Sequence, residues 1–160
     1  MPGIYGDDRI IEQWYSELRI EYADRLLIDP EESIKQEIHA GLHAFNMKVF
    51  PHEDSLDVAC IATNDNGEFC GGLFGEIYTN TLFVKYFWLD ENKRKSGLGR
   101  EVFSLAESKV QQMGITDIYL DTFSFQARDF YLKLGFEEVG RYSGYPMAGV
   151  DKIFLQKRIG

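Results

Sequence analysis

The spacing of apolar residues in the middle of the chain predicts a run of β-strands. Apolar residues recur at every second position of the segment 58–62, and the turn sequence Asn-Asp-Asn-Gly follows at 64–67. The next two segments, 69–78 and 81–89, are rich in aromatic and β-branched residues, and only Thr79-Asn80 separates them. Two such runs joined by two residues are typical of a β-hairpin.

The first part of the chain predicts a strand and then a helix. In the segment 18–22, Leu18, Ile20 and Tyr22 alternate with charged residues, as in a half-buried strand. A helix start follows at 29–32, where Asp29 can cap, Pro30 suits the first turn and Glu32 completes a capping box. One apolar stripe continues this helix before Pro51 and consists of Ile34, Ile38, Leu42 and Phe45.

The second half of the chain predicts two more helices between strands. A helix is expected over about 97–113, with Gly114 ending it. The residues expected to face inward from it are Val102, Leu105, Ala106, Val110 and Met113. The remaining predicted elements are a strand at 118–122, a helix at 126–134 closed by Gly135, and strands at 136–142 and 151–157.

This order of elements predicts an α+β (α/β) fold with a mixed, mostly antiparallel central sheet of about 6–7 strands, flanked by helices. No linker, repeat or low-complexity tract divides the chain, so we expect a single domain over residues 1–160. The 44% hydrophobic content is enough for a sizeable core and excludes disorder for most of the chain.

Charge and cysteine content narrow the functional class. The net charge of −9 argues against general binding to nucleic acid or to anionic membranes, because both require positive charge. Cys60 and Cys70 are too few for a disulfide framework and match no zinc motif, so we expect free thiols in a reducing cytoplasm. The first ten residues resemble no signal peptide, and the apolar segment 81–89 is too short to span a membrane. We therefore expect a cytoplasmic protein.

The segment 92–100, Asn-Lys-Arg-Lys-Ser-Gly-Leu-Gly-Arg, is the most informative in the chain. Four of the chain's 17 Lys and Arg residues lie between Lys93 and Arg100, at the predicted start of a helix. Cations are unfavourable at a helix N-terminus unless an anion binds there, and Gly97 and Gly99 would let backbone N–H groups approach such an anion. A solvated turn is the alternative. The Walker and dinucleotide-binding patterns are both incomplete, so the pattern by itself indicates only a phosphate-like anion.

A second segment, 124–136, places a tyrosine on the inner face of a predicted helix. Its apolar stripe consists of Ala127, Phe130, Tyr131 and Leu134. An inward Tyr131 is either a core residue or a general acid whose hydroxyl reaches a ligand beside the helix.

The two segments together resemble the GNAT family of N-acetyltransferases. The acetyl-CoA loop of that family, R/Q-x-x-G-x-G/A, is matched by 94–99, and its later motif, N-x-x-A-x-x-x-Y-x-x-x-G-F, is matched at Ala127, Tyr131, Gly135 and Phe136. Ser124 stands where asparagine is common in the family, which leaves one cofactor hydrogen bond unassigned. The motifs span about residues 84–136.

The resemblance implies an acetyl-CoA-dependent N-acetyltransferase with a GNAT-like fold and no metal. Backbone N–H groups of 95–100 would hold the pyrophosphate, and the strand end 87–89 would separate from the neighbouring strand and pair with pantetheine. A backbone N–H near Leu89 would polarise the acetyl carbonyl. The residues implied to bind the cofactor are Phe87, Trp88, Leu89, Arg94, Lys95, Ser96, Gly97, Leu98, Gly99, Arg100, Ser124, Ala127 and Tyr131.

The resemblance also implies direct attack by an amine, with Tyr131 protonating the departing thiolate. Glu76 resembles the location of a glutamate that often acts as general base in the family, and Asp121 is a second candidate. The acceptor would be a primary amine of a small molecule or peptide, and the loop with Tyr142, Tyr145 and Pro146 would line its side of the cleft. A homodimer is possible.

Two alternatives remain at this stage. The first is a non-catalytic acyl-CoA-binding sensor or partner module of the same fold, which would not need an inward Tyr131. The second is a nucleotide-binding protein that uses the glycine loop for a phosphate. A metal site is not among them: His39 and His43 have HExxH spacing, but Ala40 stands where the glutamate would be, so we expect no metal.

Overall fold

The computed structural model describes residues 32–50 and 55–160, and the chain divides into two compact units, Met1–Pro51 and His52–Gly160. The predicted strand at 18–22 and the predicted helix start at 29–31 lie outside the described residues. The single domain expected over the whole chain stays a prediction.

The described part of the first unit, residues 32–50, contains helix α2, Glu32–Asn46. The helix ends before Pro51, as predicted. Lys35 pairs with Glu32 at 3.1 Å, one turn apart. The i, i+4 spacing places Ile34, Ile38 and Leu42 along one side of the helix.

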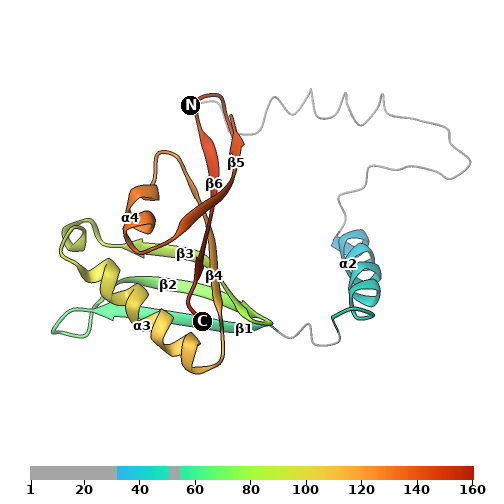
Figure 1. Ribbon diagram of the computed structural model, residues 1–160, viewed down its shortest axis with the longest axis horizontal. Helices are drawn as coiled ribbons and strands as arrows, with labels where there is room; N and C mark the ends of the chain where they lie inside the picture. Colours follow the sequence, from blue (N-terminus) through green and yellow to red (C-terminus); the bar gives the residue numbers. More distant parts are fainter. Residues whose placement is uncertain (1–31, 51–54) are drawn as a thin grey trace, which may run out of the picture. The chain divides into compact units, whose positions relative to one another are not determined.

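The second unit contains a six-stranded sheet (Figure 1). The strands are β1 (Leu56–Thr63), β2 (Phe69–Tyr78), β3 (Thr81–Leu89), β4 (Asp117–Phe123), β5 (Glu137–Ser143) and β6 (Asp151–Arg158). Their order is β1-β2-β3-β4-β6-β5, and every neighbouring pair is antiparallel except β3 and β4. The mostly antiparallel sheet expected from the sequence is confirmed.

Three helical segments connect these strands. The short η1 (Glu91–Lys93) and helix α3 (Leu98–Gln112) lie between β3 and β4, and α4 (Arg128–Lys133) lies between β4 and β5. Helix α4 is shorter than the predicted helix at 126–134, so that boundary was wrong. The reason is local: the Gln126 side chain accepts a hydrogen bond from the Phe123 N–H, and the Gln126 N–H donates to the Phe123 carbonyl, which closes a turn before the helix.

Helices α3 and α4 bury side chains in the same core as the sheet. The fully buried core residues are Leu82, Val110, Ile118, Leu120, Ile153 and Leu155. On α3 the predicted inner face was partly wrong: Phe103 is buried at 2% exposure, whereas Leu105 is 51% and Met113 54% exposed. Gly99, Val102, Phe103, Ala106 and Val110 form the buried stripe, so the helix is rotated away from Leu105, and Met113 lies beyond its last turn.

The two cysteines are free, as predicted. Cys70 is buried in β2, and Cys60 is half-buried in β1, where desolvation raises the pKa of its thiol. Among the described residues, no helix is long and apolar enough to cross a membrane.

The parallel strands β3 and β4 separate part-way along their length. They pair from Thr81 opposite Asp117 to Val84 opposite Leu120, and the pairing stops there. At the same level, Lys85 is an extra residue in β3, because Val84 pairs with Gly75 and Tyr86 with Phe74. Such a bulge bends a strand and increases its twist. The segment 85–89 therefore pairs with β2 on one side only within the described chain, which confirms the predicted separation.

Candidate active site

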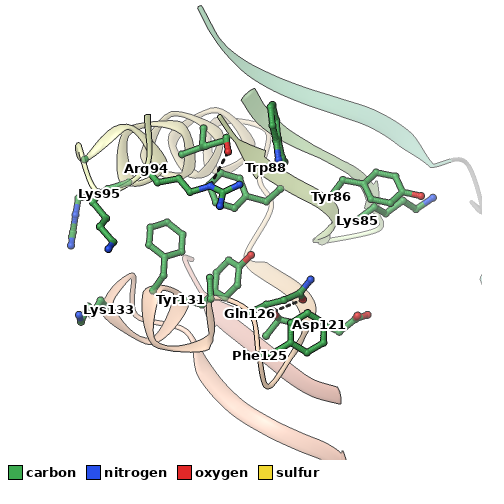
Figure 2. Close-up of a pocket in the computed structure, with 18 residues that line it drawn as sticks. Lys85, Tyr86, Trp88, Arg94, Lys95, Asp121, Phe125, Gln126, Tyr131 and Lys133 are labelled. Atoms are coloured by element: carbon green, nitrogen blue, oxygen red, sulfur yellow. Dashed lines mark hydrogen bonds between the residues drawn. The ribbon is translucent and has the colours of Figure 1, made fainter. Parts of the chain in front are cut away.

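A cavity of about 1170 Å³ occupies the gap where β3 and β4 separate. Figure 2 shows its two walls: β3 and the loop after it on one side, and the end of β4, the following turn and α4 on the other. Lys95 and Lys133 lie at one end of the view, and Lys85, Tyr86 and Asp121 at the opposite end. We call these the basic end and the aromatic end of the pocket.

Backbone N–H groups are free at the basic end. The loop before α3 turns through two residues with left-handed backbone, Lys95 at φ 61° and Gly97 at φ 96°, and Gly97 is the N-cap of the helix. Within the described chain, the N–H groups of Ser96, Gly97 and Gly99 donate no hydrogen bond. Open space lies where a Gly97 side chain would be. Free N–H groups around a helix N-terminus are suited to an anion.

Gly99 is needed for a different reason, namely close packing. A Cβ at Gly99 would lie 3.1 Å from Cζ of Phe130 and 3.3 Å from Cζ of Phe87, closer than ordinary van der Waals contact. The absence of a side chain therefore lets the start of α3 approach the floor of the pocket, where Phe87 and Phe130 stack.

The basic end carries cations that lack acidic partners. Arg94, Lys95, Arg100 and Lys133 all line the pocket, and none forms an ion pair with a carboxylate in the part of the chain that the structure describes. Nε of Arg94 donates to the Leu89 carbonyl at 3.0 Å, which fixes the loop to the end of β3. In a chain of net charge −9, this concentration of unpaired cations favours an anionic ligand.

Tyr131 of α4 lies near the middle of the pocket, with its ring buried at 7% exposure. The ring contacts Phe87, Phe103 and Phe136 edge-on, at centroid distances of 6.5, 5.8 and 6.0 Å. Burial raises the pKa of the hydroxyl to about 12. The hydroxyl points from the α4 wall into the opening (Figure 2), and it has no hydrogen-bond partner among the described residues. It is therefore a neutral proton donor available to a ligand.

Two carboxylates lie near the aromatic end, and both are ion-paired. Asp121 lines the pocket and contacts Nζ of Lys152 at 3.1 Å. Glu76 is bound by Lys85, the bulged residue of β3, and Glu76 itself is not among the lining residues. Of the two candidate bases, only Asp121 thus faces the cavity directly.

Gln126 forms part of the α4 wall with a fixed orientation. Its Oε1 accepts hydrogen bonds from the Phe123 N–H at 2.9 Å and from the Thr122 hydroxyl at 3.0 Å. A backbone N–H can only donate, so the atom facing Phe123 must be the oxygen. The amide nitrogen is therefore the group left facing the pocket (Figure 2).

Most of the residues expected to bind cofactor line this pocket. They are Phe87, Trp88, Leu89, Arg94, Lys95, Gly97, Gly99, Arg100, Ala127 and Tyr131. Three others do not line it. The Ser96 hydroxyl donates to the Lys93 carbonyl, the half-buried Leu98 packs against the core, and the Ser124 hydroxyl accepts from the Asp151 N–H.

Sequence reasoning missed several lining residues. These are Lys85, Tyr86, Thr122, Phe125, Gln126, Phe130 and Lys133. The place of Lys85 in the pocket depends on the bulge in β3, and that of Gln126 depends on the turn before α4. Neither the bulge nor the turn has a sequence signature. Tyr142 and Tyr145 stack on each other at 5.1 Å and do not line this cavity.

Residues 11–136 match the sequence model of the acetyltransferase (GNAT) family. The chain belongs to this family. Over 130 residues it is 28% identical to the blasticidin-S acetyltransferase of Streptomyces morookaense, a match that covers 80% of this chain and 95% of that protein. The GNAT resemblance noted in the sequence is confirmed, and the protein is an N-acetyltransferase.

Solved structures share the GNAT fold. A crystal structure of an acetyltransferase from Bacillus cereus superposes with a TM-score of 0.77 at 28% identity, covering 84% of this chain and 97% of that one. An aminoglycoside 6'-N-acetyltransferase complexed with coenzyme A has the same fold, with a TM-score of 0.58 at 17% identity over 83% of this chain and 95% of that one. The sensor and nucleotide-binding alternatives therefore find no support in the comparisons.

Proposed function

We propose that this N-acetyltransferase transfers the acetyl group of acetyl-CoA to a primary amine of a small molecule or peptide by direct attack. The observation that carries the proposal is the single pocket that joins three features: free N–H groups at the start of α3, the one-sided edge of β3 and the neutral hydroxyl of Tyr131. Each feature suits one part of the donor.

The basic end fits the pyrophosphate. The N–H groups of Ser96, Gly97 and Gly99 would donate to its oxygens, and Lys95 and Arg100 would balance its charge. Because Arg94 is tied to the Leu89 carbonyl, it would hold the loop in shape. The side chains of Leu98 and Ser124 do not line the pocket, so neither would contact the cofactor. Leu98 would pack against the core, and Ser124 would anchor the start of β6.

The edge of β3 fits the pantetheine arm. Backbone groups of 85–89 have no partner strand on the β4 side in the described chain, so an extended amide-containing arm can hydrogen-bond there as an added strand. Phe87 and Trp88 would pack against it. One N–H of this edge would donate to the acetyl oxygen, where negative charge develops as the amine attacks.

Acetyl-CoA supplies an activated thioester, and residues of the chain donate and accept the protons. The Tyr131 hydroxyl would donate to the thiolate sulfur that leaves. A carboxylate at the aromatic end would accept a proton from the substrate's ammonium group, and the neutral amine that remains would attack the acetyl carbon. We favour Asp121 for this role because it lines the pocket, with Glu76 as the alternative through the Lys85 pair.

The acceptor is proposed to be an amine of a small molecule. The support is the blasticidin-S acetyltransferase, which matches this chain over 95% of its own length and is named for an antibiotic. A peptide amine, a homodimeric assembly and a cytoplasmic location stay predictions.

Calorimetric titration of acetyl-CoA tests the donor half of the proposal. The unaltered protein should bind with a saturable heat, and Gly97→Glu should abolish that heat by placing a carboxylate in the anion position. Gly67→Glu is the matched control: Gly67 has φ 81° and open space, as Gly97 has, but lies in the β1–β2 turn. Equal loss in both variants, or no binding by the unaltered protein, would contradict the proposal.

A further inference from the structure

We infer that the aromatic end of the pocket binds the acceptor as a flat, ring-bearing amine whose ring carries a hydrogen-bond acceptor. The inference rests on the proposed function, because it takes the basic end to hold the acetyl donor. It adds the chemical class of the second substrate and the residues that select it: Tyr86, Phe125 and Gln126.

The two aromatic side chains come from opposite walls of the pocket and are strongly exposed. Tyr86 of β3 and Phe125 of the turn before α4 are each 70% exposed and line the cavity. Each is supported from behind by a second ring: Tyr86 stacks on Phe74 at 6.2 Å, and Phe125 on Phe123 at 5.6 Å with planes 6° apart. Rings held on one face and open on the other can stack on a flat ligand.

Charge at this end distinguishes it from the basic end. Lys85 is paired with Glu76, and Asp121 is paired with Lys152. The cations at the basic end have no such partners among the described residues. The aromatic end therefore offers no unpaired cation to an anionic ligand, and a neutral or cationic ring is the favoured occupant.

The amide of Gln126 supplies the polar selectivity. Both hydrogen bonds from Phe123 and Thr122 go to its oxygen, so its two N–H donors remain for a ligand. Figure 2 shows this amide between Tyr131 and the aromatic end. A ring amine with a carbonyl oxygen or a ring nitrogen can accept from it while its amino group faces the acetyl carbon. An amine without such an acceptor leaves these donors unpaired.

The first test compares two primary amines of similar length, 2-phenylethylamine and 2-cyclohexylethylamine, in titrations with and without saturating CoA. The flat ring should bind three- to tenfold more tightly. Phe125→Leu should reduce this preference to within about twofold. Tyr78→Leu, which removes a 38% exposed aromatic ring at the β2–β3 hairpin outside the pocket, should leave it unchanged. The inference is overturned if the two amines bind equally tightly or if neither of them binds.

The second test addresses Gln126 with 1-[4-(2-aminoethyl)phenyl]ethanone, whose ring carries a ketone carbonyl that accepts a hydrogen bond but cannot donate one. This amine should bind more tightly than 2-phenylethylamine to the unaltered protein. Gln126→Glu keeps an oxygen for Phe123 and Thr122 but replaces the donors with a second oxygen, so it should abolish or reverse the preference. An unchanged preference removes Gln126 from the inference. Failure of CoA itself to bind is a separate result, which contradicts the proposed function and leaves the amine comparison readable in the CoA-free titrations.

Discussion

Phe87 of β3 and Phe130 of α4 stack across the floor of the pocket, with ring planes 1° apart and centroids 5.6 Å apart. They join the two walls of the gap between β3 and β4 just beyond the point where the strands stop pairing. The first turn of α3 packs on the same two rings at Gly99. The width of the pocket therefore depends on this aromatic pair.

Gly99→Ala should weaken acetyl-CoA binding by about tenfold with little change in folding. The added methyl would lie 3.1 Å from the Phe130 ring, so ring or helix must shift by a few tenths of an ångström. Adding Phe130→Leu should recover part of the loss, because the smaller side chain makes room. Calorimetry on the two single variants and the double variant measures this coupling. Strictly additive losses would show that the two positions act independently.

Tyr131→Phe should lower kcat at least about 100-fold, as expected for loss of a general acid. The affinity for acetyl-CoA should stay within about threefold, because the ring and its aromatic contacts remain. Steady-state kinetics and calorimetry on the same preparation separate the two effects. A parallel loss of binding and kcat would instead indicate that the hydroxyl holds the donor.

Tyr131 should also make stability depend on pH in the alkaline range. Its pKa is raised to about 12 in the folded protein, and an unfolded tyrosine has a pKa of about 10. The contribution of Tyr131 to the free energy of unfolding is therefore complete below pH 10. It is lost between pH 10 and 12, because the tyrosine ionises first in the unfolded chain. Measured by urea unfolding, the free energy of unfolding should fall between pH 9 and pH 12 by about 2–3 kcal/mol more in the unaltered protein than in Tyr131→Phe. An identical pH dependence in the two proteins would refute this assignment.

Asp121→Asn should reduce kcat more than Glu76→Gln. Both substitutions keep the side-chain shape, and both remove the carboxylate from an ion pair, with Lys152 and Lys85 respectively. Only Asp121 lines the pocket, so only its loss removes a base from the reacting amine. Steady-state kinetics on the two variants, with circular dichroism to confirm that both are folded, measure this difference in kcat. The reverse ranking would assign the base to Glu76.

Phe103→Ala should cost about 3–5 kcal/mol of unfolding free energy, whereas Leu105→Ala should cost less than about 1 kcal/mol. Phe103 is 2% exposed and contacts Phe87, Phe130 and Phe136. Leu105, two residues later, is 51% exposed. Urea unfolding of the two variants distinguishes the observed orientation of α3 from the one its sequence predicts.

Much of the secondary structure of this protein can be predicted from local sequence patterns. The bounds of β2 and β3, the six described strands and the loop 94–100 at the start of a helix are set by alternation, turn residues and glycine spacing, which act over a few neighbours. Tyr131 could be placed on an inner face because helix periodicity is local as well. The family motif was readable for the same reason: its residues lie within two short segments.

The tertiary structure decided what depends on contacts between distant segments. The orientation of α3 could not be read locally, since Leu105 and Phe103 both lie on apolar stripes and only the sheet beneath selects one. The bulge at Lys85 requires the pairing of β2 with β3. The Gln126 amide is oriented by Thr122 and Phe123, and its position opposite Tyr86 exists only because β3 and β4 separate. The sequence thus located the glycine loop at the basic end, whereas the aromatic end was determined by long-range pairing, which no local pattern encodes.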